Sequence, residues 1–124
     1  MEKKRILVVD DEEVIREILV DTIIFLHPQE DIIVVHAEHG AHALDILNKS
    51  ERPFNLLISD VRMPVMDGVA LVKQVREVYP QMHVVLTSAT GEPDGHEAHD
   101  FVPKSHGSMK IVAKGLRRLF PAQS

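Results

Sequence analysis

Short runs of apolar and β-branched residues alternate along this chain with longer segments whose apolar residues recur every three or four positions. The short runs are typical of buried strands, and the longer segments have the period of amphipathic helices. The predicted strands are residues 5–9, 32–37, 54–59, 83–87 and 101–102. The predicted helices are residues 13–26, 41–47, 69–78 and 109–119. This alternation predicts an α/β fold in which a five-stranded parallel sheet has helices on both faces.

The lengths of the connections allow a check on this fold, because parallel neighbours need crossovers of a dozen or more residues. The first three crossovers have about 22, 16 and 23 residues, whereas the fourth has only about 13. The fourth also contains Gly91, Pro93 and Gly95, which interrupt helices. We therefore expect the fourth helix to be shortened or absent.

The chain has 124 residues, of which 44% are apolar and none is cysteine. This length predicts one domain over residues 1–124, without a second domain. The absence of cysteine excludes disulfides, thiolate zinc sites and cysteine nucleophiles. No apolar run approaches the roughly 18 residues of a membrane helix, and the first run ends at Val9, unlike a secretory signal. We expect a soluble, cytoplasmic protein with no membrane contact.

Charge is distributed unevenly along the chain. The net charge of −5, from 14 basic and 19 acidic side chains, argues against direct nucleic-acid binding. All 19 acids and nine of the basic residues lie in residues 1–102, which therefore carry −10. The remaining five basic residues are Lys104, Lys110, Lys114, Arg117 and Arg118. This basic segment is either a solvated helix face, the ordinary explanation, or a docking surface for an acidic partner.

Chemically versatile side chains follow four of the predicted strands. Asp10 and Asp11 follow the first strand, Asp60 the third, Thr87 ends the fourth and Lys104 comes after the fifth. Parallel sheets bind ligands beyond the carboxyl ends of their strands. Three converging carboxylates repel one another unless a divalent cation lies between them, and oxygen ligands favour Mg²⁺ or Mn²⁺. A nearby hydroxyl and ammonium are suited to the oxygens of a phosphoryl group, and a carboxylate can be its nucleophile.

Each of these residues also has an ordinary structural explanation. Asp10 and Asp11 could cap the following helix, and Asp60 could be a turn residue. Thr87 could simply belong to its strand, and Lys104 could be a solvated surface lysine. Their joint placement at four strand ends is what these separate explanations account for poorly.

Four segments of the sequence resemble the receiver domain of two-component response regulators. They are Ile-Leu-Val-Val-Asp-Asp-Glu (6–12), Asp-Val-Arg-Met-Pro-Val-Met-Asp-Gly (60–68), Val-Leu-Thr-Ser-Ala (85–89) and Asp-Phe-Val-Pro-Lys (100–104). The resemblance spans nearly the whole chain. It implies a flavodoxin-like, CheY-like three-layer sandwich with strand order 2-1-3-4-5, and a receiver without an output domain in this sequence.

The resemblance also implies a chemistry for the acidic residues. Asp60 would accept a phosphoryl group from a phosphohistidine on a sensor histidine kinase or a histidine phosphotransfer protein. Mg²⁺, for which Mn²⁺ could substitute, would be bound by Asp10, Asp11, Asp60 and the backbone carbonyl of Arg62.

The switch of this family involves further positions. Thr87 and Lys104 would each bind a phosphoryl oxygen, and Phe101 matches the aromatic position that changes its exposure on activation in this family. For Phe101, a role as a plain core aromatic is an equal alternative.

Two features depart from the family. The proline that usually follows the lysine is missing, because Pro103 precedes Lys104 and Ser105 follows it. A cis bond before serine would cost about 2.5 to 4 kcal/mol, so we expect Lys104 to approach by another route. The short fourth crossover lies where the family has a helix of its output face. We therefore expect partners to dock mainly on the last helix and the adjoining strand edge.

Our leading hypothesis is a receiver that catalyses only its own phosphorylation and dephosphorylation and is a monomer or weak dimer. An alternative is a receiver-like interaction module that works independently of phosphate. A phosphohydrolase acting on external substrates fits less well, because Arg62 occupies the position where a second carboxylate would be needed.

The eight histidines suggest a different kind of metal site. His39 and His42 lie three residues apart, as do His96 and His99. No further ligand lies at a matching spacing, so we regard such a site as a minor alternative.

Overall fold

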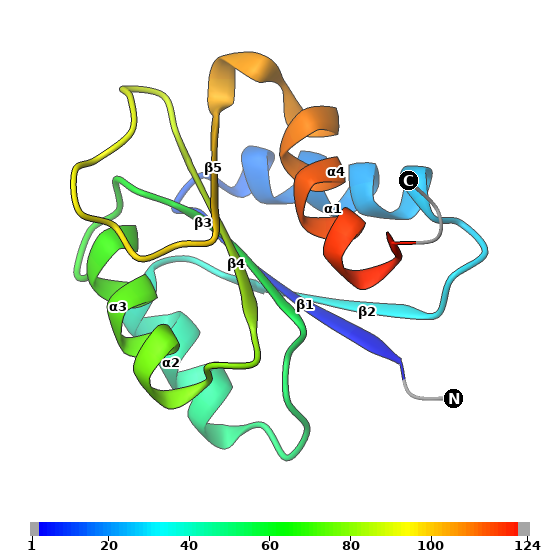
Figure 1. Ribbon diagram of the computed structural model, residues 1–124, viewed down its shortest axis with the longest axis horizontal. Coiled ribbons are helices and arrows are strands. Elements are labelled where there is room, and N and C mark those ends of the chain that lie inside the picture. The colour runs from blue at the N-terminus through cyan, green and yellow to red at the C-terminus, as the bar shows by residue number, and fades with distance from the viewer. Residues whose placement is uncertain (1–2, 122–124) are drawn as a thin grey trace.

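The computed structural model describes residues 3–121 and has the alternating architecture that the sequence predicts (Figure 1). Its elements in chain order are β1 (Lys4–Val9), α1 (Glu13–Leu26), β2 (Ile32–Ala37), α2 (Gly40–Lys49), β3 (Leu56–Asp60), α3 (Gly68–Val78), β4 (His83–Ser88), β5 (Asp100–Pro103), the 3₁₀ turn η1 (Lys104–His106) and α4 (Ser108–Leu119). The strands form one parallel sheet in the order β2-β1-β3-β4-β5. The predicted fold class and strand order are confirmed.

Helices cover both faces of the sheet, because the inner strands are apolar on both sides. Leu7 and Val9 of β1 pack into the core under α2 and α3, whereas Ile6 and Val8 pack toward α1 and α4. Figure 1 shows the two helix pairs on opposite sides of the sheet. Burial of alternate strand residues in two separate cores explains why the predicted strands are continuous apolar runs rather than alternating ones.

The fourth crossover contains no helix, as predicted. Residues 89–99 connect β4 to β5 as a loop, in which Gly91 and Gly95 have φ angles of 113° and 68°. This left-handed backbone region favours glycine and is incompatible with a continuing helix. β5 is an outer strand of the sheet in this order, and α4 packs beside it.

The elements begin and end close to the predicted positions, with one instructive difference. The third strand was expected from residue 54, but β3 begins at Leu56. The Asn55 backbone still pairs with Arg5 and His83, but the Arg5 N–H donates to the Asn55 side-chain Oδ1 at 2.9 Å. Phe54 is still buried, and the Arg5 guanidinium stacks over its ring.

Side-chain caps explain where two helices start, and one of them explains the spacing of His39 and His42. The Asp67 side chain accepts a hydrogen bond from the Ala70 N–H at the start of α3. His39 accepts in the same way from the His42 N–H at the start of α2, so their spacing is that of a helix cap. Among the described residues, neither histidine pair belongs to a group of three potential metal ligands.

Within residues 3–121, no helix has both the length and the apolar character that crossing a bilayer would require.

Candidate functional site

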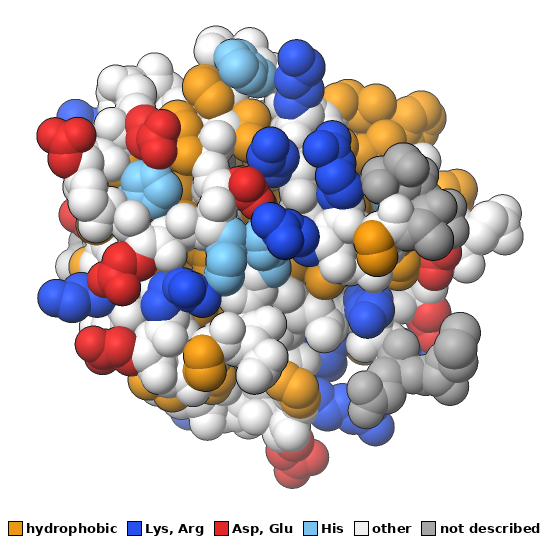
Figure 2. Space-filling view, in the orientation of Figure 1, with side chains coloured by type: hydrophobic (Ala, Val, Ile, Leu, Met, Phe, Trp, Pro, Cys, Tyr) orange, Lys and Arg blue, Asp and Glu red, His pale blue; other side chains and the backbone are white. Residues whose placement is uncertain are grey.

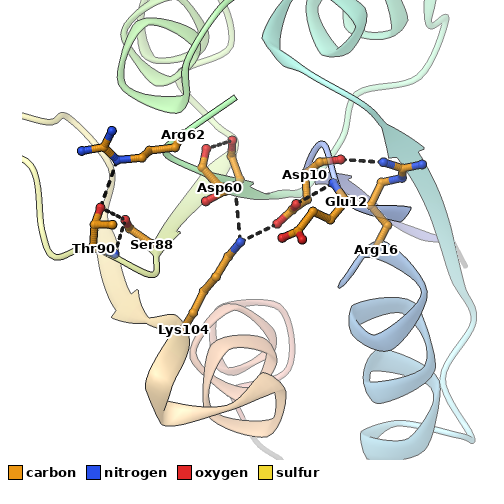
Figure 3. A network of polar contacts seen from close by, with 9 residues as sticks. Asp10, Glu12, Arg16, Asp60, Arg62, Ser88, Thr90 and Lys104 are labelled. Carbon is orange, nitrogen blue, oxygen red and sulfur yellow. Dashed lines mark hydrogen bonds and ion pairs between the residues drawn. The ribbon is translucent and has the colours of Figure 1, made fainter. Parts of the chain in front are cut away.

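The carboxyl ends of β1 and β3 bring three aspartates together at one edge of the sheet (Figure 3). Val9 pairs with Ser59, so the following residues, Asp10 and Asp60, lie side by side. One carboxylate oxygen each from Asp10, Asp11 and Asp60 lie within 4.8 Å of one another. Asp10 is fully buried and Asp60 is 5% exposed, whereas Asp11 faces solvent. Two desolvated carboxylates and one exposed carboxylate form an oxygen-rich cup that suits a hard divalent cation.

The backbone around Asp10 is held by neighbours on β2 and α1. The Asp10 N–H donates to the carbonyl of Ala37 at 3.2 Å, and its own carbonyl accepts from Arg16 Nη1 at 2.6 Å. Its Oδ1 accepts from the Glu12 N–H at 2.9 Å. These bonds orient the Asp10 carboxylate and leave its second oxygen free to face Asp60 and Lys104. Neither Arg16 nor Glu12 was singled out from the sequence, because an arginine in a first helical turn gives no local sign of such a contact.

Asp60 is held in place by the loop that follows it. Gly68 donates its N–H to the carbonyl of Val61 at 2.8 Å, which brings the start of α3 against the end of β3. A Cβ atom at Gly68 would collide with the Asp60 carbonyl oxygen. Glycine is therefore required here by close approach rather than by an unusual φ angle.

Lys104 lies between the two buried aspartates. Its Nζ is 3.0 Å from Asp10 Oδ2 and 3.3 Å from Asp60 Oδ2. Every peptide bond among the described residues is trans, and the lysine reaches the site from the first position of η1. The expectation of a different route agrees with this geometry: Pro103 ends β5, and the chain turns directly after it.

Opposing interactions act on the pKa of Asp60 and on that of Lys104. Burial raises the pKa of Asp60 above its ordinary value of 3.8, and the negative charge of Asp10 raises it further, while Lys104 acts in the opposite direction. For Lys104, burial is the largest single influence and disfavours the ammonium. The hydrogen bond to Asp10 and the charges of Asp10 and Asp60 together outweigh it, so the pKa of Lys104 is raised above 10.5. The Asp60 carboxylate is thus only partly compensated by its protein neighbours, which leaves an electrostatic role for a bound cation.

A pocket of about 320 Å³ opens in front of these carboxylates. It is lined by Asp11, Glu12, Asp60, Arg62, Ser88, Ala89, Thr90 and Lys104. Arg62 forms part of its wall by donating from Nε to Thr90 Oγ1 at 3.1 Å, and Thr90 Oγ1 lies 3.1 Å from Ser88 Oγ (Figure 3). Thr90 could not be predicted as a pocket residue, because its contacts depend on the loop that replaces the fourth helix.

Thr87 is adjacent to the pocket but does not line it. It pairs with Asp60 in the β3–β4 register and is fully buried. Its Oγ1 has no hydrogen-bond partner among the described residues. A buried hydroxyl without a partner costs about 1–3 kcal/mol, so Thr87 is a donor that an incoming oxygen could satisfy.

Phe101 is not brought to the carboxylates. It pairs with Leu86 across β4 and β5, is half-buried, and packs against the core under α2 and α3. Its ring centroid is 6.2 Å from that of His96 in the 89–99 loop. Both the core explanation and the switch explanation remain compatible with this position.

Comparisons with known proteins give a consistent answer. Residues 6–116 match the family model described as the response regulator receiver domain. The DNA-binding transcriptional regulator NtrC of Proteus hauseri is 36% identical over 110 residues, covering 84% of this chain and 22% of that protein. A CheY homologue of Campylobacter jejuni, a chemotaxis protein, is 38% identical over 89 residues, covering 70% of this chain and 65% of that protein. The chain thus spans less than two thirds of the length of both relatives.

The fold is also shared with solved structures. The response regulator TrrA of Thermotoga maritima, solved in complex with Mg²⁺-BeF, superimposes with a TM-score of 0.76 at 28% identity. The match covers 94% of this chain and 98% of that one.

Proposed function

This chain belongs to the family of response regulator receiver domains, and from that membership we propose that it accepts a phosphoryl group on Asp60 in the presence of Mg²⁺. The donor would be a phosphohistidine on a sensor histidine kinase or a histidine phosphotransfer protein. The observation that carries the proposal is the Asp60 carboxylate, 3.3 Å from the Lys104 ammonium and within 4.8 Å of two further carboxylates at a pocket that opens to solvent.

The transfer forms one bond and breaks one bond. An Asp60 oxygen attacks phosphorus, the phosphorus–nitrogen bond of the phosphohistidine breaks, and the histidine nitrogen keeps the bonding electrons and ends protonated. When bound by Asp10, Asp11 and Asp60, Mg²⁺ supplies positive charge to the phosphoryl oxygens. Lys104 is already placed to follow the negative charge from the carboxylate to the new phosphoryl group.

Thr87 supplies the conformational part of the proposal. Its unpartnered hydroxyl gains an acceptor when phosphoryl oxygens arrive beside Asp60. The resulting movement of the end of β4 would be transmitted to the neighbouring β5, on which Phe101 lies.

The phosphodonor would dock beside the pocket on α1. Val14, Ile18 and Phe25 are spaced by four and seven residues on one side of this helix, and they are 64%, 43% and 71% exposed. Such a stripe favours a helical partner with an apolar face. Replacing Ile18 by glutamate should slow phosphotransfer from a purified phosphotransfer protein and leave labelling by a small phosphodonor unchanged. Equal slowing of both reactions would contradict docking at this stripe.

The proposal is tested by incubating the full chain with Mg²⁺ and acetyl phosphate and measuring its intact mass. Wild type should gain one phosphoryl group, and Asp60→Asn should gain none. Asp45→Asn is a matched control, because Asp45 is an exposed aspartate that pairs with Lys49 on α2. Chelation of Mg²⁺ should abolish the gain. An unmodified wild-type mass under all conditions, or equal labelling of the Asp60 variant, would contradict the proposal.

We also propose that catalysis is confined to this self-modification. A phosphohydrolase needs a second carboxylic acid near the nucleophile. In this pocket Arg62 lies at that position, and its Nε donates a hydrogen bond to Thr90 Oγ1. Turnover of p-nitrophenyl phosphate that is lost in Asp60→Asn would contradict this. The placement of Lys104 beside Asp60 also removes one reason for a phosphate-independent interaction module, since the displaced proline does not keep the lysine away.

A further inference from the structure

The 89–99 loop, which replaces the fourth helix, is attached to the rest of the fold at both of its ends. At its first end, Thr90 Oγ1 accepts from Arg62 Nε, and both residues line the phosphoacceptor pocket. At its last end, the backbone N–H of His99 donates to the Val84 carbonyl at 3.0 Å. The Val84 N–H in turn donates to Nδ1 of the His99 ring at 2.9 Å. A histidine side chain therefore helps to hold the loop against β4.

Both ring nitrogens of His99 face hydrogen-bond donors. Nδ1 faces the Val84 N–H, and Nε2 lies 2.9 Å from Nη1 of Arg76 on α3. A neutral imidazole has one nitrogen that can accept a hydrogen bond, whereas an imidazolium has none. Whichever nitrogen is the acceptor, protonation of His99 removes it. The Val84 N–H is then left without an acceptor, and a positively charged ring lies against the Arg76 guanidinium.

Charged and titratable groups of β4, α3, α4 and β5 act on the His99 ring. The His83 ring of β4 stacks on it, with 4.4 Å between the ring centroids. Arg76 of α3 and Arg118 of α4 disfavour a positive charge on either ring. Asp100 of β5 favours such a charge, but its Oδ2 lies 2.8 Å from His83 Nε2. The one carboxylate that acts on both rings is thus engaged by His83, and His99 is left facing cations.

The surroundings of the two rings favour their neutral forms. Figure 2 shows adjacent histidine side chains near the middle of one face of the molecule, with basic side chains on both sides. Further positive charge comes from Lys114 and Arg117 of α4, which line a hollow together with Asp100. Burial and nearby positive charges lower the pKa of His99 below 6.5, and burial also lowers the pKa of His83. The stability of the attached loop therefore declines as pH falls from 6.5 toward the lowered pKa.

The other histidine of the loop has a different set of partners. His96 Nδ1 accepts from the Ala98 N–H at 3.2 Å, and its Nε2 lies 2.7 Å from Glu92 Oε2. A protonated His96 would lose the Ala98 bond but would gain an ion pair with Glu92. His99 has a cation in the place of that carboxylate, so its protonation opposes the attached loop without compensation.

We propose that His99 is an acid-sensitive anchor, which holds the 89–99 loop against β4 when its ring is neutral and releases the loop when its ring is protonated. Release also loosens the pocket wall formed by Thr90 and Arg62. Thr90 is exposed, and its hydroxyl hydrogen bonds contribute little stability by themselves, so the wall depends on the rest of the loop. The proposal does not rest on phosphorylation of Asp60, because every group that it uses is present in the unphosphorylated protein.

The test follows amide hydrogen exchange and ¹⁵N NMR signals of the unphosphorylated full chain from about pH 7.5 to about pH 5. Exchange rates are converted to protection factors, because intrinsic exchange itself depends on pH. Protection of the Val84 amide should fall by about tenfold or more as pH decreases below 6.5. The Arg62 Nε–H signal should shift with the same midpoint, and the amides of β1 should keep their protection.

His99→Asn separates protonation from a merely structural role, because the asparagine Oδ1 can accept from the Val84 N–H and does not titrate. This variant should keep Val84 protected over the whole pH range, whereas His99→Ala should lack the protection even at the highest pH. His36→Asn is the matched control, since it removes an exposed histidine of β2. It should follow the wild-type pH profile.

Several outcomes would overturn the proposal. They are unchanged Val84 protection in acid, an equal acid response in His99→Asn, and loss of β1 protection at the same pH, which would indicate global unfolding. An acid response of Val84 without any shift of the Arg62 Nε–H signal would overturn the link to the pocket. No phosphodonor or Mg²⁺ is used, so failure of this proposal and failure of the phosphorylation proposal are distinguishable.

Discussion

Replacing Asp60 by asparagine should stabilise the metal-free protein, although Asp60 forms an ion pair with Lys104. The Asp60 carboxylate is 5% exposed and shares its surroundings with the fully buried Asp10. Burial and the Asp10 charge both raise its pKa, which means that the folded state disfavours its ionised form. Asparagine keeps the shape and can still accept a hydrogen bond from Lys104.

The size of the effect follows from opposing interactions. At an effective dielectric constant of about 20, the Lys104 ammonium at 3.3 Å attracts the Asp60 carboxylate by about 5 kcal/mol. The Asp10 carboxylate, within 4.8 Å, repels it by at least roughly 3.5 kcal/mol. The net attraction left is at most about 1.5 kcal/mol, and the desolvation of a buried ion, still several kcal/mol, exceeds it and decides the sign. After allowing for burial of the amide, we expect a gain of about 1–2 kcal/mol.

The gain should depend on pH in a defined direction. The pKa of Asp60 is raised in the folded state, so ionisation opposes folding above that raised value. As pH falls through the folded-state pKa toward 3.8, wild type becomes neutral at this position and the advantage of the variant disappears.

The assay is urea denaturation in a chelator at neutral pH, followed by far-ultraviolet circular dichroism because the chain has no tryptophan. Asp45→Asn is the control and should change stability by less than about 1 kcal/mol, since its ion pair is exposed. Mg²⁺ at a hundredfold excess over its Kd should stabilise wild type by about 2.7 kcal/mol and the variant by less. A variant less stable than wild type in chelator would refute the reasoning.

Three other substitutions give separate predictions. Gly68→Ala should destabilise the fold by about 3 kcal/mol in urea denaturation, because its Cβ would collide with the Asp60 carbonyl; an unchanged midpoint would contradict this. Thr87→Val should raise stability slightly, by up to about 1 kcal/mol, because it removes an unpartnered buried hydroxyl, yet NMR should show a loss of the phosphorylation-induced shifts in β5. Burial lowers the pKa of His83, so wild type should lose stability as pH falls from 6.5 toward that lowered value, and His83→Gln should lessen the loss; parallel pH profiles would exclude this role.

The sheet was predictable because its strands are buried on both faces and therefore leave continuous apolar runs in the sequence. The missing helix was predictable for an equally local reason, since Gly91, Pro93 and Gly95 occupy a crossover too short to accommodate it. The start of β3 was not, because the Arg5 N–H of β1 is bound by the Asn55 side chain just before regular strand pairing begins at Leu56. The hydrophobic periodicity of a sequence does not indicate a hydrogen bond between a side chain and the backbone of a neighbouring strand.

The same distinction applies to the site. Asp10, Asp11 and Asp60 could be found because strand ends converge in any parallel sheet, whatever the loops do. Arg16 and Thr90 could not, because each acts through one contact that the tertiary fold creates, with the Asp10 carbonyl and with Arg62. Residues placed by topology are thus readable from sequence, and residues placed by a single side-chain contact are not.

Lys104 shows how far electrostatics can compensate for a change of backbone. The displaced proline removes the local geometry that usually aims this lysine, yet its Nζ lies within 3.3 Å of both buried carboxylates across trans peptide bonds. The long, flexible Lys104 side chain places its ammonium between the two desolvated carboxylates, because their negative charges offset the cost of burying it. The attraction of Asp10 and Asp60, rather than the position of Pro103, therefore determines where this ammonium lies.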